Sequence, residues 1–376
     1  MTTLVTGARL LDEGGVVEGG WVLLDGDTIA ATGTGDPPPA GERVDLGGGG
    51  LVPGFVDLHA HGGGGHSFDD GPDAVRAALA VHRAAGTTRS VVSLVAAPMA
   101  ELEESLAGIA DLAAADPTVL GAHLEGPFLA PTRRGAHEAC HLREPTRADV
   151  DRLLAAARGT LRQVTVAPEL PAALDAVRAF AAAGVTVAVG HTEAGAALTA
   201  AAFDAGARLL THALNAMPGL HHREPGPVGA ALADPRVTLE LVLDGVHVHP
   251  VVAALLMAGA PGRVALVTDA MAAAGGSDGD HRLGALEVTV RGGRAVLAGT
   301  DTIAGSTLTQ DAALRAALAA GVAEPAAVAA LTAVPARALG LGHRLGRLAP
   351  GYAADVVALG ADRSVTAVWA AGERVR

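Results

Sequence analysis

The sequence predicts an α/β protein: a TIM-type (β/α)8 barrel with a small β-sandwich domain that both ends of the chain build together. From residue 53 to residue 343, short apolar runs alternate with alanine-rich stretches that end in glycine, as βα units do. Residues 1–52 and 344–376 instead alternate apolar and polar positions around turn signals such as Asp-Gly, which is typical of short strands. We therefore expect the two terminal segments to fold together beside a barrel that spans residues 53–343.

The barrel strands are expected at eight apolar runs, which cover residues 54–61, 88–96, 119–126, 161–169, 184–192, 207–214, 237–248 and 263–270. An additional hairpin is expected at residues 284–300, after the eighth strand. Residues 35–50 read as a turn-rich connector, because glycine and proline dominate them. Eight βα units in roughly 290 residues match the size of a TIM barrel.

Charge and composition exclude several classes of protein. A formal net charge of −13 argues against nucleic acid or an anionic membrane as the main partner. The chain has no lysine, which excludes a Walker-type phosphate loop, a Schiff-base lysine and a carboxylated lysine that bridges two metals. The start has no basic and apolar leader and no apolar run is long enough to span a membrane, so we expect a cytoplasmic protein. The single cysteine, Cys140, excludes an internal disulfide and is interpreted as an uninvolved thiol in a loop near the site.

Metal-capable side chains gather at the carboxyl ends of the predicted strands. The strands end at or carry His59, His61, His123, Glu125, His191, His212, Asp244, His247 and Asp269. In a TIM barrel these strand ends form the active-site face. Side chains at i and i+2 of a strand point to one side, so His59 and His61 can hold one ion together. Imidazole combined with carboxylate favours Zn²⁺ or Fe²⁺ over Ca²⁺ or Mg²⁺.

These residues indicate metal-assisted hydrolysis of an amide-like bond. A divalent metal lowers the pKa of a bound water, and a nearby carboxylate can take its proton and return it to the leaving group. Asp269 is the candidate for that carboxylate, because it stands on the last strand, apart from the histidines. A lone histidine at a strand end is usually a structural residue, but that explanation would have to hold on five strands at once. His66, His82 and His281 are interpreted as incidental, and His221 and His222 as solvated or close to substrate.

Several motifs carry a resemblance to a known family. The first, "PGFVDLHAHG" (53–62), resembles the entry strand of the amidohydrolase superfamily. Together, "HLEGPFL", "GHT", "THALNAMPG", "HHREPG", "VTDAM" and "IAGSTLT" resemble the N-acetylglucosamine-6-phosphate deacetylases within that superfamily. The resemblance implies a barrel of amidohydrolase type, a divalent metal and a homodimer. It also implies a reaction that removes acetate from N-acetylglucosamine 6-phosphate to give glucosamine 6-phosphate in amino-sugar catabolism.

The resemblance also implies roles for individual residues. Glu125, His191 and His212 would bind the principal metal, and Asp269 would serve as general base and acid. His137 would polarise the acetyl carbonyl. The remaining substrate contacts implied by the motifs are Ala136, Asn215, Ala216, Arg223, His247, Ile303, Ala304 and Gly305.

Four questions stay open at the level of sequence. His59 and His61 allow a second metal, with Glu125 as the bridge, but they do not require one. Arg223 could reach the substrate phosphate in its own subunit or in a neighbour. N-acetylgalactosamine 6-phosphate is an alternative substrate, and a non-catalytic amidohydrolase-like interaction protein is a more distant alternative.

Overall fold

The computed structural model describes residues 2–376 and contains the predicted barrel. Its eight parallel strands are β6 (Phe55–Asp57), β9 (Thr87–Leu94), β10 (Val119–Glu125), β11 (Leu161–Val166), β12 (Thr186–Val189), β13 (Leu209–Leu210), β14 (Thr238–Leu241) and β15 (Val264–Leu266). Each lies next to its predecessor in the chain, from β6 to β15. Each overlaps one predicted run, so the fold class and the eight strands are confirmed.

The first and last barrel strands meet just beyond their ends. Ala60 and Ala270 form a parallel bridge, and the backbone nitrogen of Asp269 donates to the carbonyl of His59 at 2.8 Å. Asp57 accepts hydrogen bonds from the hydroxyl and the backbone nitrogen of Thr268, at 2.6 and 3.2 Å. These contacts bring the residues that follow β15 against those that follow β6.

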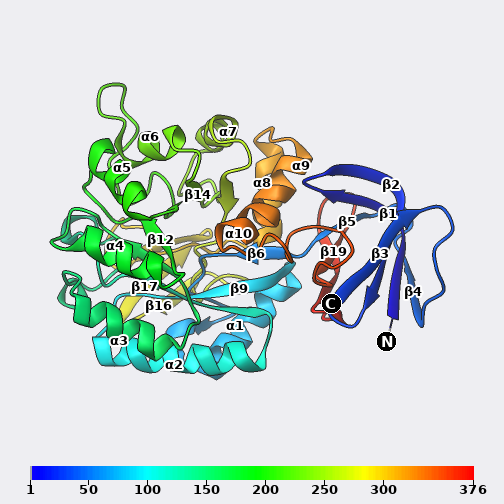
Figure 1. Cartoon of the computed structure of the whole chain (residues 1–376), viewed down its shortest axis with the longest axis horizontal. Helices are drawn as coiled ribbons and strands as arrows, with labels where there is room; N and C mark the ends of the chain where they lie inside the picture. Colours follow the sequence, from blue (N-terminus) through cyan, green and yellow to red (C-terminus); the bar gives the residue numbers. More distant parts are fainter. Residues whose placement is uncertain (1) are drawn as a thin grey trace.

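Helices cover the outside of the barrel (Figure 1). They are α1 (Pro72–Ala84), α2 (Met99–Ala115), α3 (Arg147–Ala157), α4 (Ala173–Ala182), α5 (Ala196–Ala205), α6 (Gly226–Ala233), α7 (Pro250–Gly259), α8 (Gln310–Ala319), α9 (Glu324–Leu331) and α10 (Ala333–Ala338). Helix α1 shows why they form: proline opens it, and it buries Val75, Ala78, Leu79 and His82 at helical spacing. With few aromatic residues, the core is built from valine, leucine and alanine.

The two chain ends build one mixed sheet of eight strands. It contains β1 (Thr2–Asp12), β2 (Gly15–Asp25), β3 (Thr28–Thr34), β4 (Glu42–Asp45), β5 (Gly50–Pro53), β19 (Val356–Leu359), β20 (Val365–Ala370) and β21 (Glu373–Arg374). Strand β5 lies between β1 and β19, which joins the two termini in one sheet at the right of Figure 1. The prediction of a turn-rich connector at residues 35–50 was wrong for residues 42–45. These residues form β4, which pairs with β1 in parallel register. The domain boundaries at 52/53 and 343/344 stay predictions.

Short elements complete the chain. The hairpin predicted at 284–300 is present as β17 (Leu286–Arg291) and β18 (Arg294–Leu297), and β16 (Gly279–Leu283) adds a third strand. A two-stranded ribbon, β7 (Gly62–Gly63) and β8 (His66–Ser67), follows β6. Single 3₁₀ turns lie at Phe68–Asp70, Pro131–Arg133 and Ala139–His141. Among residues 2–376, no helix has the length and apolar character needed to cross a membrane.

Candidate active site

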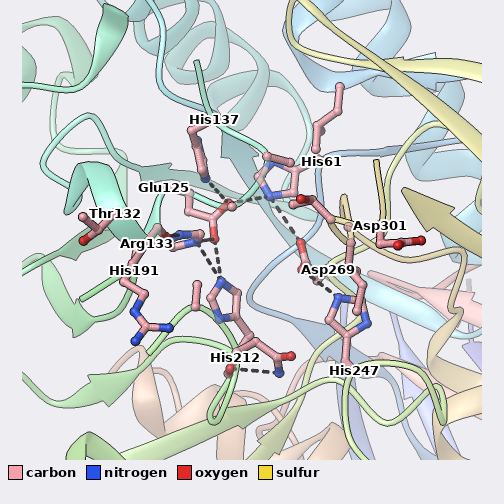
Figure 2. Close-up of a pocket in the computed structure, with 18 residues that line it drawn as sticks. His61, Glu125, Thr132, Arg133, His137, His191, His212, His247, Asp269 and Asp301 are labelled. Carbon is pink, nitrogen blue, oxygen red and sulfur yellow. Dashed lines mark hydrogen bonds and ion pairs between the residues drawn. The ribbon is translucent and has the colours of Figure 1, made fainter. Parts of the chain in front are cut away.

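The carboxyl ends of five barrel strands converge on one buried group of imidazoles and carboxylates (Figure 2). His59 and His61 follow β6, Glu125 ends β10, and His191, His212 and Asp269 follow β12, β13 and β15. All six side chains are buried. The barrel therefore brings together residues that are up to 210 positions apart in sequence, since a parallel barrel places every strand's carboxyl end on the same face.

The first group of potential ligands is Glu125, His191 and His212. Oε1 of Glu125 lies 3.1 Å from Nε2 of His191 and 3.0 Å from Nε2 of His212. The two Nε2 atoms are 2.9 Å apart. These three ligand atoms point toward one buried position, where a divalent cation would fit. Two imidazole nitrogens and a carboxylate oxygen suit Zn²⁺ or Fe²⁺.

The second group shares Glu125 with the first and adds His59, His61 and Asp269. Nε2 of His61 is 3.1 Å from the other carboxylate oxygen, Oε2, of Glu125. It is 3.5 Å from Oδ1 of Asp269. The sequence interpretation placed Asp269 apart from the histidines, and this was wrong, because barrel closure sets the end of β15 beside the end of β6. Glu125 thus lies between two groups of potential metal ligands.

The backbone at the site adopts an unusual conformation. His191, His212, Ala216 and Asp269 have φ angles of 46°, 25°, 50° and 48°. Residues other than glycine seldom adopt positive φ, and such conformations persist at functional sites because the surrounding structure enforces them. Gly135 (φ 55°) also lies here, and a Cβ on it would approach Cε1 of His191 to 3.1 Å. The sharp turns after β12, β13 and β15 direct the side chains of His191, His212 and Asp269 into the barrel mouth.

Contacts behind the imidazoles determine which ring nitrogen carries the proton. Nδ1 of His59 lies 3.2 Å from Oε2 of Glu240, and Nδ1 of His191 lies 2.7 Å from the carbonyl oxygen of Arg133. Both partners can only accept, so each Nδ1 carries a hydrogen and each Nε2 faces the centre, where it would present its lone pair to a bound metal ion. Glu240 is fully buried and also accepts from Gln163 at 2.6 Å.

His123, at the end of β10, does not join either group. Its Nδ1 lies 2.9 Å from the hydroxyl of Ser93, and its Nε2 lies 2.9 Å from the hydroxyl of Thr165. Burial lowers the pKa of His123 well below its ordinary value, and the positive charge of His59 lowers it further. His123 is therefore a neutral structural residue between neighbouring strands.

The electrostatics of the site keep Glu125 ionised and His137 neutral. Burial would raise the pKa of Glu125, but the charge of His59 and hydrogen bonds from His137, His191 and His212 hold it well below its usual range. Burial lowers the pKa of His137 to about 4. The backbone nitrogen of Ala96 donates to Nδ1 of His137 at 3.2 Å, so the ring hydrogen is on Nε2, which lies 3.3 Å from Oε2 of Glu125.

A cavity of about 370 Å³ opens above the two groups. The predicted residues that line it are His61, Glu125, Ala136, His137, His191, His212, Asn215, Ala216, His247, Asp269, Ile303 and Gly305. Nε2 of His247 lies 3.8 Å from Oδ2 of Asp269, and its Nδ1 lies 2.8 Å from Oδ2 of Asp244. That hydrogen bond raises the pKa of His247, although burial opposes the shift.

Three predicted residues do not line the cavity. His59 lies beneath it within the second group, and Ala304 is fully buried behind its neighbours. Arg223 is exposed in the loop before α6, outside the lining of its own chain's cavity. Cys140 is also exposed, 3.6 Å from Oε2 of Glu138 and 3.8 Å from Nδ1 of His141.

The sequence interpretation missed several residues of the site. The cavity is also lined by Thr132, Arg133, Leu283, Asp301 and Thr302, which loops and the β16–β18 sheet supply. Glu240 was missed because it lies inside β14 and not at its end. A single carboxylate within an apolar strand is a signal that could have identified it, since a buried charge requires a partner.

Comparison with known proteins agrees with this geometry. Residues 51–375 match the model of the Amidohydrolase family. The chain is 41% identical to the N-acetylgalactosamine-6-phosphate deacetylase of Escherichia coli O157:H7, over 99% of both chains. It is 36% identical to the human N-acetylglucosamine-6-phosphate deacetylase, over 99% of this chain and 93% of that one.

Solved structures give the same result. The N-acetyl-D-glucosamine-6-phosphate deacetylase of Mycobacterium smegmatis, solved as a mutant in complex with N-acetyl-D-glucosamine-6-phosphate, superposes with a TM-score of 0.95. It is 44% identical and covers 100% of this chain and 99% of that one. The Thermotoga maritima N-acetylglucosamine-6-phosphate deacetylase, at 29% identity, has a TM-score of 0.90 over 99% of both chains. The chain therefore belongs to the amidohydrolase family.

Proposed function

We propose that this protein is a metal-dependent deacetylase that hydrolyses the acetamide of N-acetylglucosamine 6-phosphate to acetate and glucosamine 6-phosphate. The observation that carries the proposal is Asp269, a carboxylate at the mouth of the barrel that adjoins both a metal-capable group and the cavity. The M. smegmatis relative, solved with N-acetyl-D-glucosamine-6-phosphate, supports this substrate.

Glu125, His191 and His212 would hold the principal ion, Zn²⁺ or Fe²⁺, and His59 and His61 would add a second beside it. A divalent ion bound there would lower the pKa of a water and withdraw electrons from a carbonyl. No lysine is present to bridge two ions, so the two oxygens of Glu125 would serve both groups. The surroundings of these oxygens support that role, because Oε1 lies beside His191, His212 and His59, whereas Oε2 lies beside His61.

The residues of the chain would carry out the proton transfers. Asp269 would accept a proton from the attacking water and donate it to the nitrogen of the leaving amine. His137, neutral and protonated on Nε2, would donate a hydrogen bond to the acetyl oxygen as negative charge develops there. His247, hydrogen-bonded to Asp244, would orient Asp269 and contact the sugar.

The phosphate would bind at the opposite end of the cavity, near Asn215 and Ala216. We propose that Arg223 from a second subunit completes this site in a homodimer. Its exposure outside its own cavity supports a role in the neighbouring site. Exposed apolar side chains in the same region offer a surface for the second subunit: Leu220, Val246, Val251 and Leu255.

Replacing Arg223 with Ala is expected to raise KM for the phosphorylated sugar by about tenfold or more, because a charge-assisted contact to phosphate is lost. The KM for unphosphorylated N-acetylglucosamine should change little. Steady-state kinetics on both substrates measures the difference, and Arg294→Ala, on the exposed edge of β18, is the control. Equal increases for both substrates would contradict the phosphate role.

The E. coli O157:H7 relative favours N-acetylgalactosamine 6-phosphate as a second candidate substrate. The two sugars differ in the configuration of one hydroxyl group. Measuring acetate release from both sugar phosphates with the metal-loaded protein decides between them. Release from neither sugar would overturn the proposed function and leave the non-catalytic interaction protein as the alternative.

Replacing Glu240 with Gln is expected to weaken metal binding about 10- to 100-fold, because the carboxylate that orients and polarises His59 is lost. The fold should persist, since the unpartnered Oε1 of Gln163 can turn to accept from the new amide. Competition with a chelator measures the affinity, and Glu101→Gln, on the exposed side of α2, is the control. Unchanged affinity for the metal would show that Glu240 packs inside the barrel without affecting metal binding.

A further inference from the structure

A second cavity, of about 460 Å³, lies at the opposite end of the barrel. It is formed where β9, β10 and β11 begin, with α2 on one side and residues 341–345, after α10, on the other. None of its lining residues lines the cavity at the metal-capable groups. Four of its lining side chains are arginines and one is acidic: Arg89, Arg158, Arg162, Arg344 and Asp111. This concentration of positive charge stands out in a chain with a net charge of −13.

Two of the four arginines are already neutralised. Nε of Arg89 lies 2.6 Å from Oδ2 of Asp355, in a buried pair that joins the barrel to the terminal sheet. A terminal nitrogen of Arg158 lies 2.7 Å from Oδ1 of Asp111. These two pairs form the wall of the cavity and contribute no net charge to it.

The other two arginines keep their charge. Arg162 donates one hydrogen bond, from Nε to the carbonyl oxygen of Leu120 at 2.7 Å, which leaves its two terminal nitrogens available. Arg344 is exposed, and its side chain makes no hydrogen bond within residues 2–376. Over the same described part of the chain, neither guanidinium forms an ion pair. The cavity therefore carries about two uncompensated positive charges.

Apart from Thr160, the remainder of the wall is apolar. Ala113, Pro117, Leu120, Leu341 and Leu345 line it beside the guanidinium groups. A bare phosphate ion would leave most of the volume and all of this apolar wall without contact. A ligand that fits has a doubly charged head for the arginines and a small carbon body for the wall.

We propose that this cavity is a second ligand site, which binds a phosphate monoester dianion. Arg162 and Arg344 would contact the phosphate, since a guanidinium offers paired donors that match two phosphate oxygens. Arg162 belongs to the barrel, whereas Arg344 belongs to the segment that leads to the C-terminal strands. The ligand would tie that segment to the barrel and stabilise the folded chain by mass action. This proposal does not rest on the proposed function.

The test is equilibrium dialysis of the metal-loaded protein with glucose 6-phosphate or inorganic phosphate at fixed ionic strength. The double variant Arg162→Gln/Arg344→Gln should bind one fewer glucose 6-phosphate per chain than the natural protein. Thermal unfolding should show a smaller rise of Tm with ligand in that variant. Its kcat and KM on the phosphorylated amino sugar should be unchanged, because the cavity lies away from the active site.

A matched control is Arg76→Gln/Arg178→Gln, which removes the same charge from exposed helix surfaces. It should bind glucose 6-phosphate as the natural protein does. The single variant Arg344→Gln, whose side chain makes no hydrogen bond or ion pair within residues 2–376, should weaken binding about tenfold or more. Equal stoichiometry in all variants would overturn the site. If inorganic phosphate bound at this site as tightly as glucose 6-phosphate, the monoester assignment would be overturned, because the apolar wall would then contribute nothing to binding.

Discussion

Replacing Asp269 with Asn is expected to lower kcat by about 10²- to 10⁴-fold, while the protein keeps its fold and its principal metal ion. Asparagine matches aspartate in size but cannot accept the proton of the attacking water. The backbone should not change, because asparagine tolerates the left-handed conformation that residue 269 adopts, with φ of 48°. The first group of potential metal ligands, Glu125, His191 and His212, should keep its geometry.

Steady-state kinetics and metal analysis of the same preparation measure both parts of this prediction. A loss of kcat with unchanged metal content would assign Asp269 to proton transfer and not to ion binding. The control is Asp73→Asn, at a fully exposed position on α1, which should retain full activity. Turnover within a few-fold of the natural protein in Asp269→Asn would mean that another group serves as the base.

The barrel was predictable because its strands are buried on both faces. Strands β9 and β10 are almost completely buried, and their valine and leucine residues mark them in the sequence between helix-forming stretches, although both strands also carry polar residues. Strand β4 was missed for the opposite reason. It has four residues, three of them exposed, in a segment rich in glycine and proline. Only its register with β1 makes it a strand, and a pairing partner cannot be seen in the local sequence.

The candidate site was predictable where a histidine or an acidic residue stands at the carboxyl end of a predicted strand. Glu125, His191 and His212 meet this condition, so topology alone placed them together. Contacts across the barrel were not predictable in this way. The approach of Asp269 to His61 depends on closure of the barrel, and Glu240 reaches His59 from another strand. Such contacts follow from the three-dimensional path of the chain and have no signature in spacing.

Replacing Glu125 with Gln is expected to abolish binding of both ions, whereas His59→Asn/His61→Asn should remove only one. The geometry gives the reason: Oε1 of Glu125 faces His191 and His212, and Oε2 faces His61. Loss of the carboxylate charge weakens both groups, because it is the one anionic side chain that they share. Loss of His59 and His61 leaves the first group, Glu125, His191 and His212, complete.

Metal content per chain, measured after chelation and reconstitution with Zn²⁺ or Fe²⁺, distinguishes the two variants. His281→Asn, in the β16–β18 sheet away from both groups, is the matched control and should bind as many ions as the natural protein. One ion per chain in both the natural protein and the double variant, with unchanged kcat, would make His59 and His61 structural residues. Two ions in the natural protein and one in the double variant would instead establish a second site, since the two groups share only Glu125 and can be emptied separately.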